Sequence, residues 1–414
     1  MVMPISNPPR RAATAFILVT VVLDVLSLGI IIPVLPKLIE NFVDGNTVRA
    51  AQMLGLFGTA WALMQFIFSP LLGALSDRYG RRPVVLLSNA GMGLDYILMA
   101  LAPTLPWLLL GRVISGITAA SFSTASAYIA DVTPAEKRAE AFGMIGAAFG
   151  LGFVLGPAIG GLLGEAGPRL PFWVAAGFSL ANAAYGYFVL PESLAPDKRA
   201  GFAWSRANPI GSIALLRSDK TLLGLAAVLF LYNLAHAVLP AVFVLYAGYR
   251  YGWSTGMIGL TLAMVGVCAA IVQGGMVKPV VAKLGEQTTL IIGLCCGAVG
   301  FAIYGLAPTG PLFWAGIPVM ALWGLTSPAV QGLMTRLVSP TEQGQLQGAG
   351  SSLMAVASLF GPALFTLTFA YFIDPQRAVQ LPGAPFLLAA LLLLVSALLA
   401  WRVTRLVRRP AVAD

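Results

Sequence analysis

The stretch Ala15-Phe-Ile-Leu-Val-Thr-Val-Val-Leu-Asp24-Val-Leu-Ser-Leu-Gly-Ile-Ile-Ile-Pro33 is almost wholly apolar, yet it carries an aspartate at its centre. Its length is close to the ~20 residues that an α-helix needs to cross the hydrocarbon core of a membrane. A carboxylate at bilayer depth costs roughly 2.5–3.5 kcal/mol on insertion scales, so such a residue usually has a function. Asp95 and Arg112 place further charges inside two later apolar runs. The pattern predicts a membrane protein that moves charged solutes or protons.

The composition supports the same conclusion over the whole chain. Of the 414 residues, 58% are hydrophobic and 10% are charged, whereas soluble domains carry about 25% charged residues. Apolar runs of spanning length recur from end to end, which predicts an all-α membrane protein with twelve transmembrane helices. We place the spans at residues 12–35, 48–72, 83–103, 105–130, 139–165, 170–190, 218–246, 255–278, 287–308, 311–336, 343–373 and 384–406.

The net charge of +9 has a topological explanation. If the spans alternate in direction, most of the 25 Lys and Arg residues fall on one side of the membrane. Only Lys37, Arg49, Arg169, Arg250 and Arg377 fall on the other. The positive-inside rule then places both termini in the cytoplasm. Because topology accounts for the basic charge, nucleic acid is not an expected partner.

Several classes of function are not expected. Cys268, Cys295 and Cys296 lie inside apolar runs without metal-ligand spacing, and the chain has a single histidine, so we expect no metal site and no cofactor. No nucleophile and base are suitably spaced, so we do not expect an enzyme. No phosphate-binding Gly-x-x-x-x-Gly-Lys-Ser/Thr run is present, which disfavours ATP-driven pumping.

The chain divides into two similar halves. A proline- and charge-rich stretch at residues 191–217 predicts a cytoplasmic linker between an N-terminal six-helix bundle (1–190) and a C-terminal one (218–414). Gly80 and Gly285 are 205 residues apart, as are the pairs Gly156-Pro157 and Gly361-Pro362. Thr133-Pro-Ala-Glu136 and Ser339-Pro-Thr-Glu342 match at nearly the same offset. A parallel pseudo-two-fold repeat is a transporter architecture, in which the substrate binds near the midplane between the halves.

Two segments of the first half carry motifs. The loop after the second span has two glycines, an aspartate and three arginines, and Asp131 ends the fourth span. This loop is either a charge cluster that pairs across the halves or a basic topogenic loop that touches anionic lipid. A glycine stripe in the fifth span indicates close helix packing, with a bend at its proline. The residues are Gly73, Asp77, Arg78, Gly80, Arg81 and Arg82 in the loop, and Gly152, Gly156, Pro157, Gly160 and Gly161 in the span.

These residues resemble the major facilitator superfamily of transporters. The glycine-aspartate-arginine loop is similar to the signature between its second and third helices, and the Gly-Pro-x-x-Gly-Gly run is similar to the motif of its drug:proton antiporters. Within the superfamily the sequence resembles the tetracycline efflux pumps over nearly its whole length. The likeness rests on Leu23-Asp24, Pro33-Val34-Leu35-Pro36, Asp77 to Pro83, Leu94-Asp95-Tyr96, Gly111-Arg112, Ala127-Tyr-Ile-Ala-Asp131, Gly344-Gln-Leu-Gln-Gly348 and Gly361-Pro-Ala-Leu-Phe-Thr366.

The resemblance implies a monomeric transporter of the bacterial inner (plasma) membrane that works by alternating access, with a small molecule and protons as its ligands. It also implies that Asp24, Asp95 and Arg112 line the cavity of the first half. Counting residues agrees. At ~1.5 Å per residue, Asp24 and Asp95 each lie about 18 Å into their spans from the cytoplasm, and Arg112 lies about 10 Å in from outside. In a layer of about 30 Å, all three lie at one level.

Two acids and one base leave one carboxylate without a compensating charge. A nearby cation favours the ionised form of an acid, and burial favours the neutral form. We therefore expect Asp95 to pair with Arg112 and Asp24 to exchange a proton with the cavity. The alternative is a static structural triad.

Candidate substrate-binding residues are uncharged, apart from His236 in the seventh span. Gln65 and Gln273 match pocket glutamines of the tetracycline pumps, and Asn233 and Gln331 are further candidates. His236 either titrates near neutral pH, binds a substrate group, or is a buried hydrogen-bonding residue. The sequence departs from the tetracycline pumps at Ala269 and Gly297, where those pumps carry a histidine and an aspartate linked to coupling.

The function predicted from these features is a proton-coupled antiporter that exports an amphipathic small molecule or drug, as in multidrug efflux and antibiotic resistance. The alternative is a proton-linked symporter that imports a small solute on the same scaffold.

Overall fold

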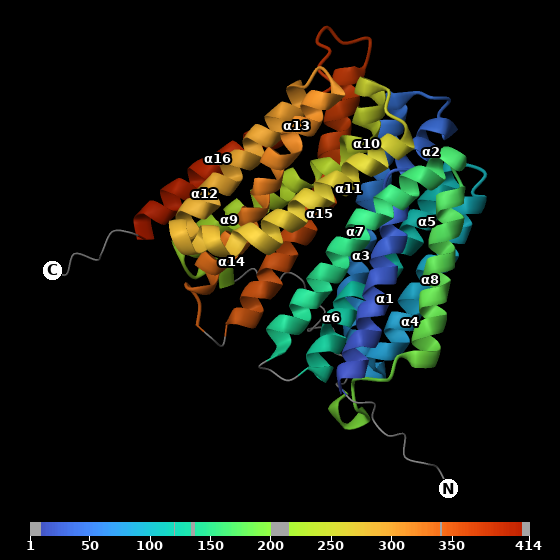
Figure 1. Ribbon diagram of the computed structural model, residues 1–414, viewed down its shortest axis with the longest axis vertical. Helices are drawn as coiled ribbons and strands as arrows, with labels where there is room; N and C mark the ends of the chain where they lie inside the picture. Colours follow the sequence, from blue (N-terminus) through green and yellow to red (C-terminus); the bar gives the residue numbers. More distant parts are fainter. Residues whose placement is uncertain (1–9, 120, 134–136, 200–214, 340–341, 408–414) are drawn as a thin grey trace, which may run out of the picture. The chain divides into compact units, whose positions relative to one another are not determined.

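The computed structural model describes residues 10–119, 121–133, 137–199, 215–339 and 342–407. Every regular element in these ranges is helical, which confirms the all-α fold (Figure 1). The helices of the first half are α1 (Arg10–Ile31), α2 (Leu35–Phe42), α3 (Thr47–Tyr79), α4 (Arg81–Leu101), α5 (Leu105–Thr118), α6 (Ser121–Val132), α7 (Arg138–Ala166) and α8 (Leu170–Val189). Those of the second half are α9 (Lys220–His236), α10 (Val238–Tyr251), α11 (Thr255–Ile271), α12 (Val277–Leu306), α13 (Gly310–Ala321), α14 (Thr326–Thr335), α15 (Gln343–Ile373) and α16 (Ala384–Val407).

Each predicted span coincides with one helix or with consecutive helices. The fourth span is α5 and α6, and the seventh is α9 and α10. The tenth span is α13 and α14 joined by a 3₁₀ turn, η6 (Leu322–Leu325), and a π-helical turn, η5 (Val272–Met276), joins α11 to α12. The short helix α2 is not predicted from the sequence. Residues 134–136 and most of the predicted linker, residues 200–214, lie outside the described residues.

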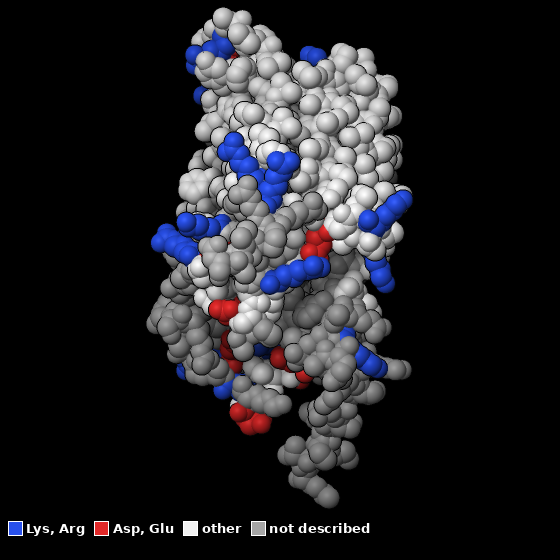
Figure 2. Space-filling model, turned by 90° about the vertical axis from the view of Figure 1, so that its left-hand side faces the viewer, with Lys and Arg blue, Asp and Glu red and all other residues white. Residues whose placement is uncertain are grey.

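Hydropathy independently indicates a multi-pass membrane protein. Within the described ranges, nine helical stretches are long and apolar enough to cross a membrane. The longest, Thr255–Leu306, has 52 residues, whereas one crossing needs about 20. Gly285 interrupts it with a φ of 76° and a ψ of 161°, so the stretch contains two spans. In Figure 2 broad areas of the surface carry no charged side chain, as expected where helices face lipid.

The residues fall into two compact units. Unit 1 consists of Met1–Leu38, Ala60–Asn208 and Thr255–Ala263, and unit 2 consists of Ile39–Thr59, Pro209–Ser254 and Met264–Asp414. The units therefore follow the two halves of the sequence except in two segments. The first part of α3 groups with unit 2, and the first part of α11 groups with unit 1.

In unit 1, α1 and α7 pack closely through glycine. A Cβ added to Gly29 would lie 3.0 Å from Cα of Gly156, and one added to Gly152 would lie 2.9 Å from Cβ of Val25. A Cβ added to Gly160 would overlap the backbone oxygen of Ile30. Small residues let helix backbones approach in this way inside a membrane.

The opposite face of α7 packs on the first part of α11. A Cβ added to Gly161 would lie 2.5 Å from the Thr255 oxygen, and one added to Gly259 would lie 3.0 Å from Cα of Gly161. The predicted glycine stripe therefore serves two neighbours, because Gly152, Gly156 and Gly160 face α1 while Gly161 faces α11.

Side-chain hydrogen bonds to backbone carbonyl groups complete the packing of both units. In unit 1, Asn182 of α8 donates to the Thr20 oxygen at 2.9 Å, and Arg169 donates to the Ala100 and Ala102 oxygens at 3.0 and 2.9 Å, where α4 ends. In unit 2, the Tyr246 hydroxyl donates to the Tyr304 oxygen at 2.7 Å, and the Tyr304 ring stacks on Phe313 with centroids 4.0 Å apart.

The start of α15 carries one half of the sequence repeat. The backbone N–H and the hydroxyl of Ser339 donate to the Glu342 carboxylate at 3.0 and 2.7 Å. Because these bonds favour the ionised form, the pKa of Glu342 lies below its usual value.

Replacing Gly160 with alanine is expected to lower the free energy of unfolding by about 1–3 kcal/mol, because the new methyl group overlaps the α1 backbone and forces the helices apart. The measurement is thermal unfolding of the purified protein. Gly150→Ala is the matched control in the same helix, because no atom lies within 4 Å of its added Cβ. Equal melting temperatures for the two variants would show that the α1–α7 contact is not tight.

Candidate functional site

Asp95 lies in α4 with only 1% of its surface exposed. Arg112 and the Ser115 hydroxyl, both on α5, are near enough to act on the carboxylate electrostatically. Neither carboxylate oxygen, however, accepts a hydrogen bond of normal length from a described residue. The carboxylate sits against Gly111, where an added Cβ would be 2.7 Å from Oδ1 of Asp95. Glycine at position 111 therefore lets α5 approach α4 closely. Arg112 nevertheless acts on Asp95 only at longer range, and the predicted direct ion pair between these two described residues is not formed.

The Arg112 guanidinium group has an aromatic neighbour. Its central carbon lies 5.3 Å from the centroid of the Trp61 ring on α3, within the ~6 Å range of a cation–π interaction. Its Nε is buried and makes no hydrogen bond with a described residue. Arg112 is therefore stabilised by the Asp95 charge and an aromatic face rather than by hydrogen bonds.

Asp24 lies in α1 and is partly buried. Its charge, like those of Asp95 and Arg112, acts on the buried Tyr96 side chain. The structure thus brings all three predicted ionisable residues of unit 1 near one tyrosine. Other buried polar atoms of unit 1 also have no hydrogen-bond partner among the described residues, namely those of Ser88, Asn89, Thr124 and Ser179 and the hydroxyl of Tyr96. Polar groups at membrane depth are typical of an ion or substrate pathway.

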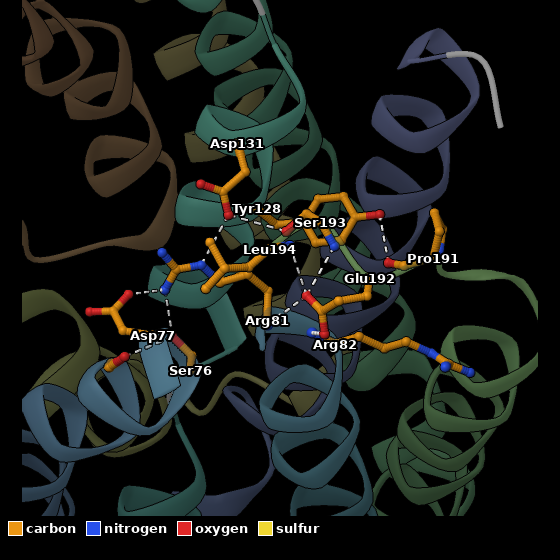
Figure 3. A network of polar contacts seen from close by, with 11 residues as sticks. Ser76, Asp77, Arg81, Arg82, Tyr128, Asp131, Pro191, Glu192, Ser193 and Leu194 are labelled. Carbon is orange, nitrogen blue, oxygen red and sulfur yellow. Dashed lines mark hydrogen bonds and ion pairs between the residues drawn. The ribbon is translucent and has the colours of Figure 1, made fainter. Parts of the chain in front are cut away.

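A second cluster lies where α3, α4 and α6 end or begin. Arg81 donates to Asp77 at 2.5 Å, to Asp131 at 3.1 Å and to the Ser76 hydroxyl at 2.7 Å (Figure 3). The predicted loop residues Asp77, Arg81 and Asp131 therefore meet, and these contacts all lie within unit 1.

Glu192, just after α8, is a member of this cluster that the sequence analysis did not identify. Its carboxylate accepts hydrogen bonds from the backbone N–H groups of Arg81 and Arg82, at 2.9 and 3.3 Å, and so caps the start of α4 (Figure 3). Gly80 makes room for it, since an added Cβ there would overlap the carboxylate and the φ of 107° disfavours other residues. The signal in the sequence that could have identified Glu192 is an acidic residue directly after the end of a span, in Pro191-Glu192-Ser193. The next residue, Ser193, joins the same cluster by donating to Asp131 at 3.2 Å.

The other loop residues lie beside the cluster. The Arg82 guanidinium group donates to the Tyr187 oxygen and lies 5.7 Å from the Tyr187 ring. Arg78 is exposed and lies over the Tyr79 ring at 5.1 Å. Gly73 contributes its carbonyl oxygen, which accepts a hydrogen bond from Ser76 at 2.8 Å.

Unit 2 contains an equivalent ion pair of opposite polarity. Arg336 at the end of α14 donates to Glu286 of α12 at 2.8 Å. Glu286 and Arg336 stand 205 residues after Arg81 and Asp131, so acid and base have exchanged positions. Each pair follows a glycine with positive φ, Gly80 at 107° and Gly285 at 76°.

In unit 2, interrupted helices meet around Trp323 in η6. The ring of His236, the last residue of α9, lies 5.4 Å from the Trp323 ring, and the Tyr232 ring lies 4.8 Å from it. Gln273, in the π-turn η5, lies 3.4 Å from a Cβ added to Gly324. His236 and Gln273 are both exposed, and neither makes a hydrogen bond with a described residue.

Trp323 also explains why position 297 is a glycine. A Cβ added to Gly297 would lie 2.7 Å from the indole ring and 2.8 Å from Leu393. An aspartate therefore does not fit there unless Trp323 moves. Ala269, the other position at which the sequence departs from the tetracycline pumps, lies in α11. Neither position supplies an ionisable group to unit 2.

The remaining candidates are amides. Asn233 and Gln331 line the same cavity, between α9, α14 and α15. Gln65 lies in the part of α3 that belongs to unit 1, and it makes no hydrogen bond with a described residue. No group of three or more metal-binding side chains occurs in the described part of the chain.

Comparisons with known proteins identify the family. A family model described as Major Facilitator Superfamily matches residues 17–362. Tetracycline resistance protein, class C, of Escherichia coli is 38% identical over 361 residues, which are 86% of this chain and 90% of that protein. Tetracycline resistance protein, class G, of Vibrio anguillarum is 38% identical over 362 residues, 87% of this chain and 91% of that protein.

A solved structure agrees with the fold. A bacterial homolog of the human lysosomal transporter Spinster aligns with a TM-score of 0.78 and 16% identity, covering 99% of this chain and 100% of that one. The sequence comparisons therefore confirm the resemblance drawn from the motifs: the chain belongs to the Major Facilitator Superfamily and, within it, to the family of the tetracycline resistance proteins.

Proposed function

We propose that this protein is a proton-coupled exporter of amphipathic drugs that works by alternating access. The observation that carries the proposal is the set of two carboxylates and one guanidinium group in the membrane-spanning part of unit 1, in a chain 38% identical to tetracycline resistance proteins. The protein functions as a monomer in the bacterial inner membrane, in contact with lipid, with both termini in the cytoplasm. The excess of Lys and Arg on one side of the spans supports that orientation.

Asp24 is the proton carrier in this proposal. Arg112 and Asp95 interact electrostatically, and Asp95 is almost completely buried. Asp24, on the separate helix α1, is only partly buried, so it is the carboxylate better placed to exchange a proton with water at membrane depth. Protonation of Asp24 from outside favours release of the drug, and loss of that proton to the cytoplasm resets the carrier.

The cytoplasmic ion pairs control closure in this proposal. Arg81 and Glu192 join the ends of three helices of unit 1, and Glu286 and Arg336 join two helices of unit 2. Partly exposed ion pairs contribute only about 0–1 kcal/mol each, so they break and form easily during a transport cycle.

Inverted membrane vesicles with an acidic lumen test the function and the proton carrier together. Addition of tetracycline outside should drive protons out of the lumen as the drug enters, because the two move in opposite directions. Asp24→Asn should reduce this exchange at least tenfold with unchanged protein yield, because an amide cannot carry the proton. Asp44→Asn, at an exposed position, is the control. Movement of tetracycline and protons in the same direction would instead indicate a symporter, and full exchange by Asp24→Asn would refute its role.

Glu192→Gln keeps one acceptor oxygen but replaces the other by a donor and removes the charge, so it should lower the free energy of unfolding by about 1 kcal/mol, within the range seen when a helix N-cap is weakened. Its melting temperature and transport rate should both fall, because α4 carries Asp95. Asp197→Asn, an exposed acid nearby, should behave as the wild type. If Glu192→Gln melts with the wild type, the cap does not hold α4.

Exchanging the acid and the base within each ion pair tests whether transport requires only the contact between the two helices or also a particular sign of charge at each position. The single variant Glu286→Arg should lower transport, because it places two cations side by side, and adding Arg336→Glu should restore at least half of the rate. The same exchange of Arg81 and Asp131 should not restore transport, because Arg81 also holds Asp77 and Ser76. Transport rates in the vesicle assay decide the outcome, and equal rescue in both units would contradict the difference.

A further inference from the structure

Unit 2 contains a cavity of about 240 Å³ between α9, α14 and α15. Its polar lining consists of three amide and three hydroxyl side chains, those of Asn233, Gln331, Gln347, Ser327, Thr335 and Ser351. No lining side chain is ionisable. The chemistry of this cavity therefore differs from that of the charged interior of unit 1.

The amide groups retain hydrogen-bonding capacity. Asn233 donates to the Leu229 oxygen at 2.8 Å, and Gln331 donates to the Ser327 hydroxyl at 3.2 Å, so the carbonyl oxygen of each side chain is available to accept. Gln347 is exposed and makes no hydrogen bond with a described residue. The cavity can thus offer both donors and acceptors to a ligand.

The rest of the lining is apolar and adaptable. Met334 and Leu346 are buried beneath the amides, and Leu229 and Met354 complete the wall. An apolar pocket with a few convergent polar groups is typical of small-molecule sites, which usually measure about 300–1,000 Å³. At about 240 Å³, this cavity has room for one part of a drug-sized molecule.

The position of the cavity in the fold also indicates a ligand. Asn233 lies just before the end of α9 at His236, and Ser327 follows directly after η6. The cavity therefore adjoins the place where two spans of unit 2 are interrupted. In transporters of other folds, interrupted helices mark the substrate site.

We propose that this cavity binds the uncharged hydrogen-bonding edge of the cargo, the part that carries hydroxyl, carbonyl or amide groups, independently of the carboxylates of unit 1. The proposal rests on the proposed export function. A charged group would lose its water without gaining a counter-charge here. An analogue that lacks the polar edge would leave the amides without partners, which gives the site its selectivity.

Cysteine protection tests occupancy of the cavity. In a chain with Cys268, Cys295 and Cys296 replaced by alanine, Ser351→Cys or Gln347→Cys is labelled with N-ethylmaleimide in nanodiscs. Tetracycline and chloramphenicol, which carry hydroxyl, carbonyl and amide groups, should each slow labelling at least fivefold. Tetraphenylphosphonium, a cation without hydrogen-bonding groups, should not. The control Ser218→Cys, exposed in unit 2 and outside the cavity, should be labelled at one rate throughout. Absence of protection by both polar drugs, or equal protection by the cation, would overturn the proposal.

Equilibrium binding of radiolabelled tetracycline tests the recognition chemistry. The double variant Gln331→Leu/Gln347→Leu, which keeps side-chain size and removes both amides, should bind at least tenfold more weakly. Gln376→Leu, an exposed glutamine outside the cavity, is the matched control. Asp44→Asn, at an exposed position outside the cavity, should bind tetracycline within twofold of the wild type. Unchanged affinity in the double variant would overturn the proposal.

The two proposals can fail separately. If wild-type vesicles exchange tetracycline for protons but neither labelling nor affinity depends on the cavity, the export function stands and the cavity assignment is wrong. If the purified protein binds tetracycline through the amides but the vesicles exchange nothing, the cavity assignment stands and the export function is wrong.

Discussion

A charge at the depth of Asp95 costs roughly 2.5–3.5 kcal/mol to insert, and the packing of three helices around this residue offsets that cost. Gly111 lets α5 approach α4, which brings the Arg112 charge to the buried carboxylate. Trp61 of α3 then covers the guanidinium group with its aromatic face. The Asp95 carboxylate has no hydrogen bond of normal length from a described residue, so Arg112 acts on it through space rather than through a direct contact. A balance of this kind is sensitive to small movements of the helices, which is what coupling a proton to a conformational change requires.

The two units have different chemistry at comparable places in the sequence repeat. Unit 1 holds both of the deep acids, whereas in unit 2 position 297 is closed to a side chain by Trp323. The indole ring that fills this space also packs on His236 and Tyr232. In unit 2, aromatic packing therefore fills the space that a side chain at position 297 would need. The two copies of the repeat can therefore keep the same helix order while one carries ionisable side chains and the other offers uncharged polar side chains to a ligand.

Much of the fold was predictable because lipid imposes a strong length and polarity constraint, and all twelve predicted spans coincide with helices. The breaks within spans were not predictable, because a π-turn at Val272–Met276 changes no hydropathy pattern. Asp24, Asp95 and Arg112 stood out by their rarity in apolar runs, but their surroundings depend on contacts of Gly111 and Trp61 that the sequence does not reveal. Glu192 was missed because its role depends on a backbone approach at Gly80 that no spacing rule reveals. Gln347 and Ser351 were missed because exposed polar residues near a helix start usually face water.

The two ion pairs, Arg81–Asp131 and Glu286–Arg336, stand at equivalent positions of the sequence repeat but have reversed polarity. Position 81 is basic and position 286 acidic, yet both make a contact of about 3 Å with the residue 50 places later. Both halves of the repeat therefore join the same two helix ends, although the signs of the charges are exchanged. The pairs still differ in consequence. Arg81 lies between two carboxylates, so it keeps an ionic partner when either one withdraws. Arg336 has Glu286 as its one ionic partner among the described residues, so separation leaves the less exposed Glu286 without its counter-charge. Arg81 can therefore exchange one carboxylate partner for the other, whereas the Arg336–Glu286 ion pair can only form or break.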